Sequence, residues 1–137
     1  MIYTGKSTRG WHRLATFQEC PQKFAYQELL GIEPEFRAPE LELGTLVHIA
    51  LANRYASMLK MPEALDPTEA MRLGAKDKLV LARAEEIYLA YAKRYEAYDW
   101  EPVAVEQEFR VGIAGDMYTQ RIDLVARYKG GIVFIDH

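Results

Sequence analysis

The sequence predicts an α+β fold in which N-terminal helices are followed by an antiparallel three-stranded meander. Within residues 1–100, apolar side chains recur every three or four positions, which is typical of amphipathic helices. From Val103 the period changes to two, which is typical of strands. Glycines separate the alternating segments, as expected of turns. We therefore expect a single domain with a helical part at 1–100 and a β-meander at 101–137.

The composition is that of an ordinary globular domain. Of the 137 residues, 50% are hydrophobic and 27% are charged, and the net charge is −3. A polyanionic partner would therefore have to contact a local basic patch. No apolar stretch is long enough to cross a bilayer, and the N-terminus lacks the apolar core of a signal peptide. The single cysteine excludes an internal disulfide, so we expect a cytoplasmic protein without a membrane partner.

The first helices are short and are separated by proline and glycine. Residues from Trp11 to Phe17 have helical spacing. A second helix is expected from Pro21 to about Leu30, because proline is favoured at the first helical position and Gly31 can end the helix. The segment Glu33–Glu40 contains two prolines and is expected to be an extended linker.

Two longer helices are expected next. Gly44–Leu59 contains no helix breaker. Asp66 can cap a helix that begins at Pro67 and extends to about Tyr98, with Gly74 as a point where it could kink or divide. An apolar stripe along this helix is expected to pack in the core. The stripe consists of Val80, Ala84, Ile87, Tyr91, Tyr95 and Tyr98.

The strand part contains three segments. Val103–Val111 alternates apolar with polar residues, and Gly112–Asp116 contains two glycines and is expected to be a turn. Met117–Arg127 is the expected second strand, and the third begins at Ile132. The last two strands form a hairpin that carries two aspartates.

The register of this hairpin decides whether Asp123 and Asp136 share a face. A Lys129-Gly130 turn places Asp123 directly opposite Asp136. A Gly130-Gly131 turn places Asp136 opposite Val125, still on the Asp123 face. Only a three-residue loop would separate the two acids. Two-residue turns that contain glycine are the commoner type, so we favour a shared face.

Apolar residues on both faces of the hairpin predict strands that are covered on both sides. Asp136 alternates with Ile132 and Phe134, and the other face carries Val133 and Ile135. Two adjacent carboxylates in such surroundings require protonation, a basic partner or a divalent cation. The alternative is that one aspartate lies at a strand end and is simply solvated.

His48 and two glutamates are further candidates for a metal site. His48 lies in a predicted helix on the apolar side with Leu51 and Tyr55, so it could be a hydrogen-bonded core residue or a metal ligand. Glu106 and Glu108 precede the hairpin on a neighbouring strand. One of them could join the site, although alternating acids usually form the solvated face of a strand.

A basic and aromatic patch is the candidate contact for nucleic acid. An ordinary helix surface would explain it equally well. The residues are Lys6, Arg9, Trp11, Arg13 and Arg121.

Three segments in order resemble the PD-(D/E)XK nuclease superfamily, in its RecB-like branch of CRISPR-associated and phage exonucleases. STRGWHRLATFQECPQKFAYQELLG resembles the N-terminal segment of that branch, and LGTLVH is similar to its G-x-x-x-H helix. RIDLVARYKGGIVFIDH resembles its "G-R-I-D-L-V … I-D-Y-K" hairpin, with Gln120 in place of the glycine. The resemblance implies a mixed α/β, restriction-endonuclease-like fold.

The resemblance also implies an activity and a role for four residues. The activity is metal-dependent, exonuclease-like cleavage of DNA in recombination or repair, or in a phage or CRISPR system; the alternative is a non-catalytic module for binding nucleic acid or protein. Asp123 and Asp136 match the two catalytic acids, and His48 matches the additional histidine ligand. His137 occupies the X position, whose main-chain carbonyl is a metal ligand. Together they would hold one or two Mg²⁺ or Mn²⁺ ions.

Two features of the family pattern are missing from these residues. The motif lysine would follow His137, so we expect a truncated domain that is inactive alone, with a core that is incomplete at its C-terminus. Such a chain could self-associate through its exposed last strand, belong to a longer protein, or work with a helicase or recombination partner. Cys20 matches one cysteine of an iron–sulfur cluster in some members, but the other three are absent. We therefore expect no cluster and an inert, buried thiol.

Overall fold

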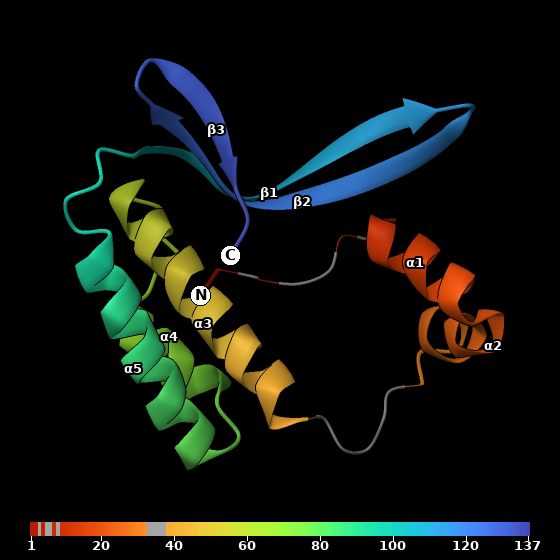
Figure 1. The fold of residues 1–137 in the computed structure, drawn as a ribbon, viewed down its shortest axis with the longest axis horizontal. Coiled ribbons are helices and arrows are strands. Elements are labelled where there is room, and N and C mark those ends of the chain that lie inside the picture. Colours follow the sequence, from red (N-terminus) through yellow and green to blue (C-terminus); the bar gives the residue numbers. More distant parts are fainter. Residues whose placement is uncertain (3, 5–6, 8, 33–37) are drawn as a thin grey trace. The chain divides into compact units, whose positions relative to one another are not determined.

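The computed structural model describes residues 1–137 except 3, 5–6, 8 and 33–37. The helices are α1 (Trp11–Glu19), α2 (Pro21–Phe24), α3 (Pro39–Met58), α4 (Pro67–Gly74) and α5 (Lys78–Arg94), and a π-helical turn η1 (Ala25–Leu29) continues α2. The strands β1 (Glu101–Ile113), β2 (Asp116–Tyr128) and β3 (Gly131–Ile135) follow them (Figure 1). This order confirms the predicted α+β class. No helix in the described ranges is long and apolar enough to cross a membrane.

The expected linker at 33–40 lies mostly outside the described residues. Its last two residues belong to α3, which begins at Pro39 rather than Gly44. Proline fits there because its missing N–H is not needed in the first turn of a helix. The prediction of an extended backbone is therefore wrong at these two positions.

The long helix expected after Asp66 is divided into α4 and α5. The Asp66 carboxylate accepts hydrogen bonds from the first-turn N–H groups of α4, as predicted. Asp77 caps α5 in the same way, accepting from Leu79 N at 2.7 Å and Val80 N at 3.2 Å. This second cap favours a new helix start over one continuous helix, and the division falls after Gly74.

The chain forms two compact units. The first contains Met1–Thr4, Ala38–Gln107 and Ile122–His137, and the second contains Gly5–Arg37 and Glu108–Arg121. Every apolar residue that is buried in the described part of the chain belongs to the first unit. The prediction of a single domain stays a prediction.

The core of the first unit lies around α3. Figure 1 shows α3 and α5 side by side, and apolar residues of α3, α4, α5 and β2 form one buried cluster. Fully burying each large apolar side chain contributes about 1.5–3 kcal/mol relative to exposure. Gly74 packs closely against α3. A Cβ atom added at this position would lie only 3.1 Å from Ile49 Cδ1. The largest fully buried apolar side chains are Leu46, Leu51, Met71 and Leu124.

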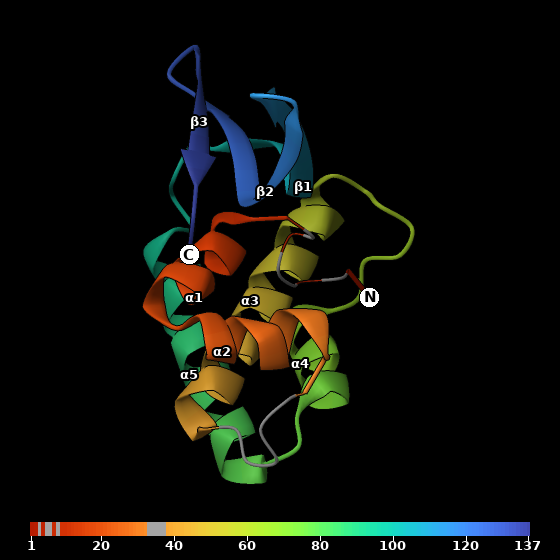
Figure 2. The same ribbon diagram turned by 90° about the vertical axis from the view of Figure 1, so that its right-hand side faces the viewer.

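The three strands form one sheet in the order β1-β2-β3, so β2 is central. In the antiparallel β2–β3 pair, Leu124 lies opposite Ile135 and Tyr128 lies opposite Gly131. The turn therefore consists of Lys129 and Gly130, whose φ values of 48° and 81° match a two-residue hairpin turn. This is the first of the two predicted turns, and its register, continued past Ile135, sets Asp136 opposite Asp123. Figure 2 shows the C-terminal end of β3 directed toward the helices of the first unit.

The expectation that both faces of the hairpin are covered is only half right. β2 buries Leu124 on one face and Val125 on the other. On β3, Val133 packs against the core, whereas Ile132 and Phe134 are 53% and 64% exposed. The prediction is wrong for β3, because the buried cluster gathers on the face that carries Val133.

Candidate metal centre

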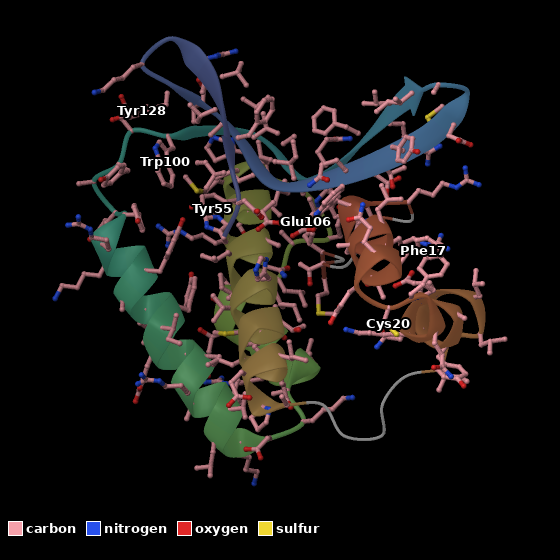
Figure 3. The ribbon with its side chains drawn as sticks, turned by 45° about the vertical axis from the view of Figure 1, so that its right-hand side comes forward. Phe17, Cys20, Tyr55, Trp100, Glu106 and Tyr128 are labelled. Carbon is pink, nitrogen blue, oxygen red and sulfur yellow. The ribbon has the colours of Figure 1, made fainter. Side chains whose placement is uncertain are left out.

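Three side chains from different elements converge in the first unit. One ligand atom each from His48, Glu106 and Asp123 lies within 4.8 Å of the other two. His48 comes from α3, Glu106 from β1 and Asp123 from β2. Figure 3 labels Glu106 where the strands meet the C-terminal half of α3. Two carboxylates and an imidazole form a donor set that suits a divalent cation.

Helix α3 places His48 at the boundary of the core. Leu51 and Tyr55, on the same side of the helix, are buried, while the His48 side chain keeps 35% of its surface exposed. Its Nδ1 lies 3.3 Å from Asp123 Oδ2. The sequence left open whether His48 is a hydrogen-bonded core residue or a ligand, and the geometry allows the second role.

The strand register places Asp123 next to the core. Its neighbour Leu124 is fully buried, and the Asp123 side chain is 16% exposed. Asp123 Oδ2 also accepts a 2.9 Å hydrogen bond from the main-chain N–H of His137. The carboxylate is therefore oriented from two directions, by an imidazole on α3 and by the backbone beyond β3.

Asp136 lies at the exposed side of this centre. It follows the last residue of β3, and continuing the register past the Leu124–Ile135 pair sets it opposite Asp123. Its side chain is exposed, and Asp136 is not among the residues with ligand atoms within 4.8 Å of one another. Its charge nevertheless helps to raise the pKa of His48. Its role as a ligand stays a prediction.

The histidine and the aspartate stabilise each other's charged forms. The hydrogen bond with Asp123 raises the pKa of His48 above its ordinary value, against the effect of burial. Burial alone would raise the pKa of Asp123, but hydrogen bonds from His48 and from the His137 N–H lower it below its ordinary value. The centre thus holds concentrated negative charge that is partly balanced by the imidazole.

Glu106 is a candidate ligand to which the sequence gave little weight. Alternation along the strand favoured a solvated side chain, yet Glu106 is half-buried and lies beside His48 and Asp123. Its φ is 49°, a left-handed conformation that is uncommon for a residue other than glycine. Such a residue interrupts the regular strand and redirects its side chain. The signal in the sequence was only that an acid precedes the aspartate hairpin on a neighbouring strand.

Glu108, two residues further along β1, lies in the second unit. Its carboxylate is 3.6 Å from Arg121 Nη2 and 3.5 Å from Arg110 Nε. Glu108 is therefore engaged by arginines.

The candidate residues for nucleic-acid binding belong to the second unit, and they differ in accessibility. Lys6 lies outside the described residues. Arg9 is exposed, and Trp11 at the start of α1 is 64% exposed. An exposed indole and a guanidinium are the groups that contact bases and phosphates.

The other two arginines of the predicted patch are held by carboxylates. Arg13 Nε lies 3.3 Å from Glu28 Oε2. Arg121 pairs with Glu108 and is only 17% exposed. A nucleic acid would have to compete with these ion pairs, so Arg9 and Trp11 are the more accessible members of the patch.

Cys20 has a local structural role. It precedes Pro21 and caps α2, and its Sγ accepts a 3.4 Å hydrogen bond from the N–H of Lys23. The thiol is partly exposed, so the expectation of a buried cysteine is wrong. The physical reason is that a residue that caps a helix start lies at the surface end of the helix.

Comparison with known proteins adds one finding. The family model described as the PD-(D/E)XK nuclease superfamily matches residues 11–137, which include His48, Glu106, Asp123 and Asp136. No curated protein and no solved structure matches the chain significantly. Because the match covers more than nine-tenths of the sequence, the chain belongs to the PD-(D/E)XK nuclease superfamily.

Proposed function

We propose that this protein is a metal-dependent DNA nuclease domain of the RecB-like branch, with Mg²⁺ or Mn²⁺ held by His48, Glu106 and Asp123. The observation that carries the proposal is the approach of these three side chains within 4.8 Å. Membership of a nuclease superfamily supports the reaction class. Asp136 and the main-chain carbonyl of His137 are the further ligands that the family pattern favours.

The ligand types favour a metal that accepts nitrogen as well as oxygen. Mg²⁺ prefers oxygen ligands and keeps several waters, whereas an imidazole shifts preference toward Mn²⁺. Two carboxylates from neighbouring strands leave room for one or two ions. We therefore expect tighter binding of Mn²⁺ than of Mg²⁺.

The chemistry requires a nucleophile and relief of charge at a phosphodiester. A bound divalent cation would supply a hydroxide at neutral pH and neutralise charge that develops on the phosphate oxygens. His48 would hold the cation as the neutral imidazole, because only that form has a lone pair available. The exposed Asp136 lies on the side of the site that solvent reaches. The lysine of the family motif would follow His137, so none of these residues is assigned its role.

DNA contacts are proposed for the second unit. The exposed Trp11 can stack on a base, and such stacking contributes about 1–3 kcal/mol per base. The exposed Arg9 can pair with a phosphate. Recombination or repair, in a bacterial, phage or CRISPR setting, is the role that the family branch favours.

A titration with Mn²⁺ tests the metal centre. A hundredfold excess over the dissociation constant stabilises a protein by about 2.7 kcal/mol, which raises the Tm of a domain of this size by several degrees. We expect this rise in the wild type and in Asp99→Asn, which removes an exposed carboxylate from the loop before β1. We expect its loss in Asp123→Asn. If Mn²⁺ does not change the Tm of the wild type, the proposed metal centre is overturned.

Cleavage of labelled DNA tests the activity itself. Single-stranded DNA, double-stranded DNA and RNA are incubated with wild type or Asp123→Asn in the presence of Mn²⁺. The family pattern places a lysine directly after His137, so the assay uses a chain that continues past this residue, and we expect cleavage of DNA only by its wild-type form. Mn²⁺ binding together with DNA binding but no cleavage would instead favour a non-catalytic binding module that keeps the nuclease fold.

A further inference from the structure

Two tyrosines enclose the ring of His137 beside the candidate metal centre. The His137 ring lies parallel to that of Tyr55, with centroids 5.9 Å apart and an interplanar angle of 4°. It meets the Tyr91 ring edge-on, at 5.3 Å and 86°. The two tyrosine hydroxyls are hydrogen-bonded at 2.7 Å. Tyr55, which is labelled in Figure 3, belongs to α3, and Tyr91 belongs to α5. Two helices therefore fix the position of the His137 ring.

The backbone of the same residue contacts the metal centre. The His137 N–H donates to Asp123 Oδ2 at 2.9 Å, and this oxygen is also the atom nearest to His48 Nδ1. A ring that is held between two helices leaves the attached main chain little freedom. The packing of the His137 ring and the orientation of the Asp123 carboxylate are therefore linked through a single residue.

The two tyrosines are themselves held in place. Tyr55 is buried and Tyr91 is partly buried. Their hydroxyls are hydrogen-bonded to each other, which fixes both rings beside the ring of His137.

We propose that Tyr55, Tyr91 and the ring of His137 form an aromatic latch that positions Asp123 for cation binding. The inference rests on the proposed metal centre and assigns these three side chains a positioning role. They act through the main-chain N–H of His137, which donates the hydrogen bond to Asp123. The latch is distinct from ordinary core packing: Tyr95 contacts Tyr91 with its ring tilted by 43°, whereas among the described residues the ring of His137 meets those of Tyr55 and Tyr91.

Two substitutions of His137 separate the ring from the backbone. His137→Ala removes the ring and His137→Phe keeps an aromatic ring, while both keep the N–H and the carbonyl. The Mn²⁺ dissociation constant is measured by calorimetry on the full chain. Loss of a group that orients a ligand commonly weakens metal affinity about 10- to 100-fold, and we expect this for His137→Ala. We expect His137→Phe to retain most of the affinity.

A pair of tyrosine substitutions provides the matched control. Tyr91→Phe removes the hydroxyl that pairs with Tyr55, and Tyr95→Phe removes a hydroxyl one helical turn away. Urea unfolding measures the stability of each variant. We expect Tyr91→Phe to weaken Mn²⁺ binding and Tyr95→Phe to leave it unchanged, even where the two lose similar stability. If His137→Ala does not fold, the comparison of Tyr91→Phe with Tyr95→Phe still tests the latch.

The outcomes distinguish the latch from the metal centre. If the wild type binds Mn²⁺ and both His137→Ala and Tyr91→Phe bind it equally well, the latch is overturned and the metal centre stands. If the wild type itself binds no Mn²⁺, the metal centre fails and the latch fails with it. A loss of affinity that is equal in Tyr91→Phe and Tyr95→Phe would show a general loss of packing and would also overturn the latch.

Discussion

The His48 imidazole and the Asp123 carboxylate, with Nδ1 and Oδ2 3.3 Å apart, make the metal-free protein sensitive to pH. His48 has a pKa raised above 6.5, so its contribution to stability is complete below that pH and is lost as the pH rises through the raised value. Asp123 has a pKa lowered below 3.8, so its contribution is present above that pH and is lost as the pH falls through the lowered value. The pair therefore stabilises the folded protein most between pH 3.8 and pH 6.5, the ordinary pKa values of the two groups.

His48→Gln tests this pair. The free energy of unfolding is measured in urea, with a chelator present, at about pH 5.5 and about pH 8 for wild type and variant. We expect the free energy of unfolding of the wild type to exceed that of the variant by more at the lower pH than at the higher pH. The difference should stay below about 1 kcal/mol, because a partly exposed ion pair contributes little. A difference that is larger at the higher pH would contradict the pairing.

The sequence indicates the residues of the centre unequally, and their roles as metal ligands stay predictions. His48 and Asp123 could be found because helical spacing and the family hairpin mark them. Glu106 was only one of two glutamates that could join the site, because its approach depends on a left-handed backbone within a strand, and alternation predicts a solvated side chain. Asp136 stays a predicted ligand at the exposed side of the site.

At the scale of elements, the β2–β3 hairpin does most to assemble the centre. Its two-residue turn sets the register that puts Asp123 and Asp136 on one face. Lys129 occupies the first turn position with a φ of 48°. This left-handed conformation is strained for a residue that has a Cβ atom. Asparagine tolerates this conformation better than lysine.

Two variants at the turn test its conformation. Lys129→Asn should raise the free energy of unfolding by about 0.5–1 kcal/mol, because it relieves left-handed strain. Lys129→Val should lower it by about 1–2 kcal/mol, because a β-branched residue is disfavoured there. Urea midpoints measure both. Equal stability of the two variants would show that the turn does not have this geometry.

Helix boundaries show what local sequence could and could not predict. The start of α4 at Pro67 was predictable, because Asp66 caps it through its own side chain. The separation of α4 from α5 depends partly on Glu42, whose Oε1 accepts hydrogen bonds from Lys76 N and Asp77 N. That contact joins residues more than thirty positions apart, so spacing alone could not show it.

At the scale of the whole molecule, buried apolar side chains are unevenly distributed between the two units. The buried apolar residues of the described chain all lie in the first unit, and α1, α2 and η1 bury none. Segments with few buried apolar contacts open at low free-energy cost. The order of elements was predictable from periodicity, but this partition was not, because β1 and β2 each contribute residues to both units.

Amide hydrogen exchange, followed by mass spectrometry or NMR, tests this distribution. We expect the amides of α1 to exchange at least about tenfold faster than those in the middle of α3, because a difference of about 1.4 kcal/mol in opening free energy changes the rate tenfold. The buried run from Ile49 to Asn53 serves as the slow reference. Protection in α1 equal to that in α3 would contradict the expected difference in stability.

The central claim is that His48, Glu106 and Asp123 bind a divalent cation, and pulsed electron paramagnetic resonance of the Mn²⁺-loaded protein tests it most directly. A manganese ion bound by His48 has a hyperfine coupling to an imidazole nitrogen. We predict this coupling in the wild type and its loss in His48→Gln. A wild type in which bound Mn²⁺ shows no nitrogen coupling, or a coupling that persists unchanged in His48→Gln, would contradict the site.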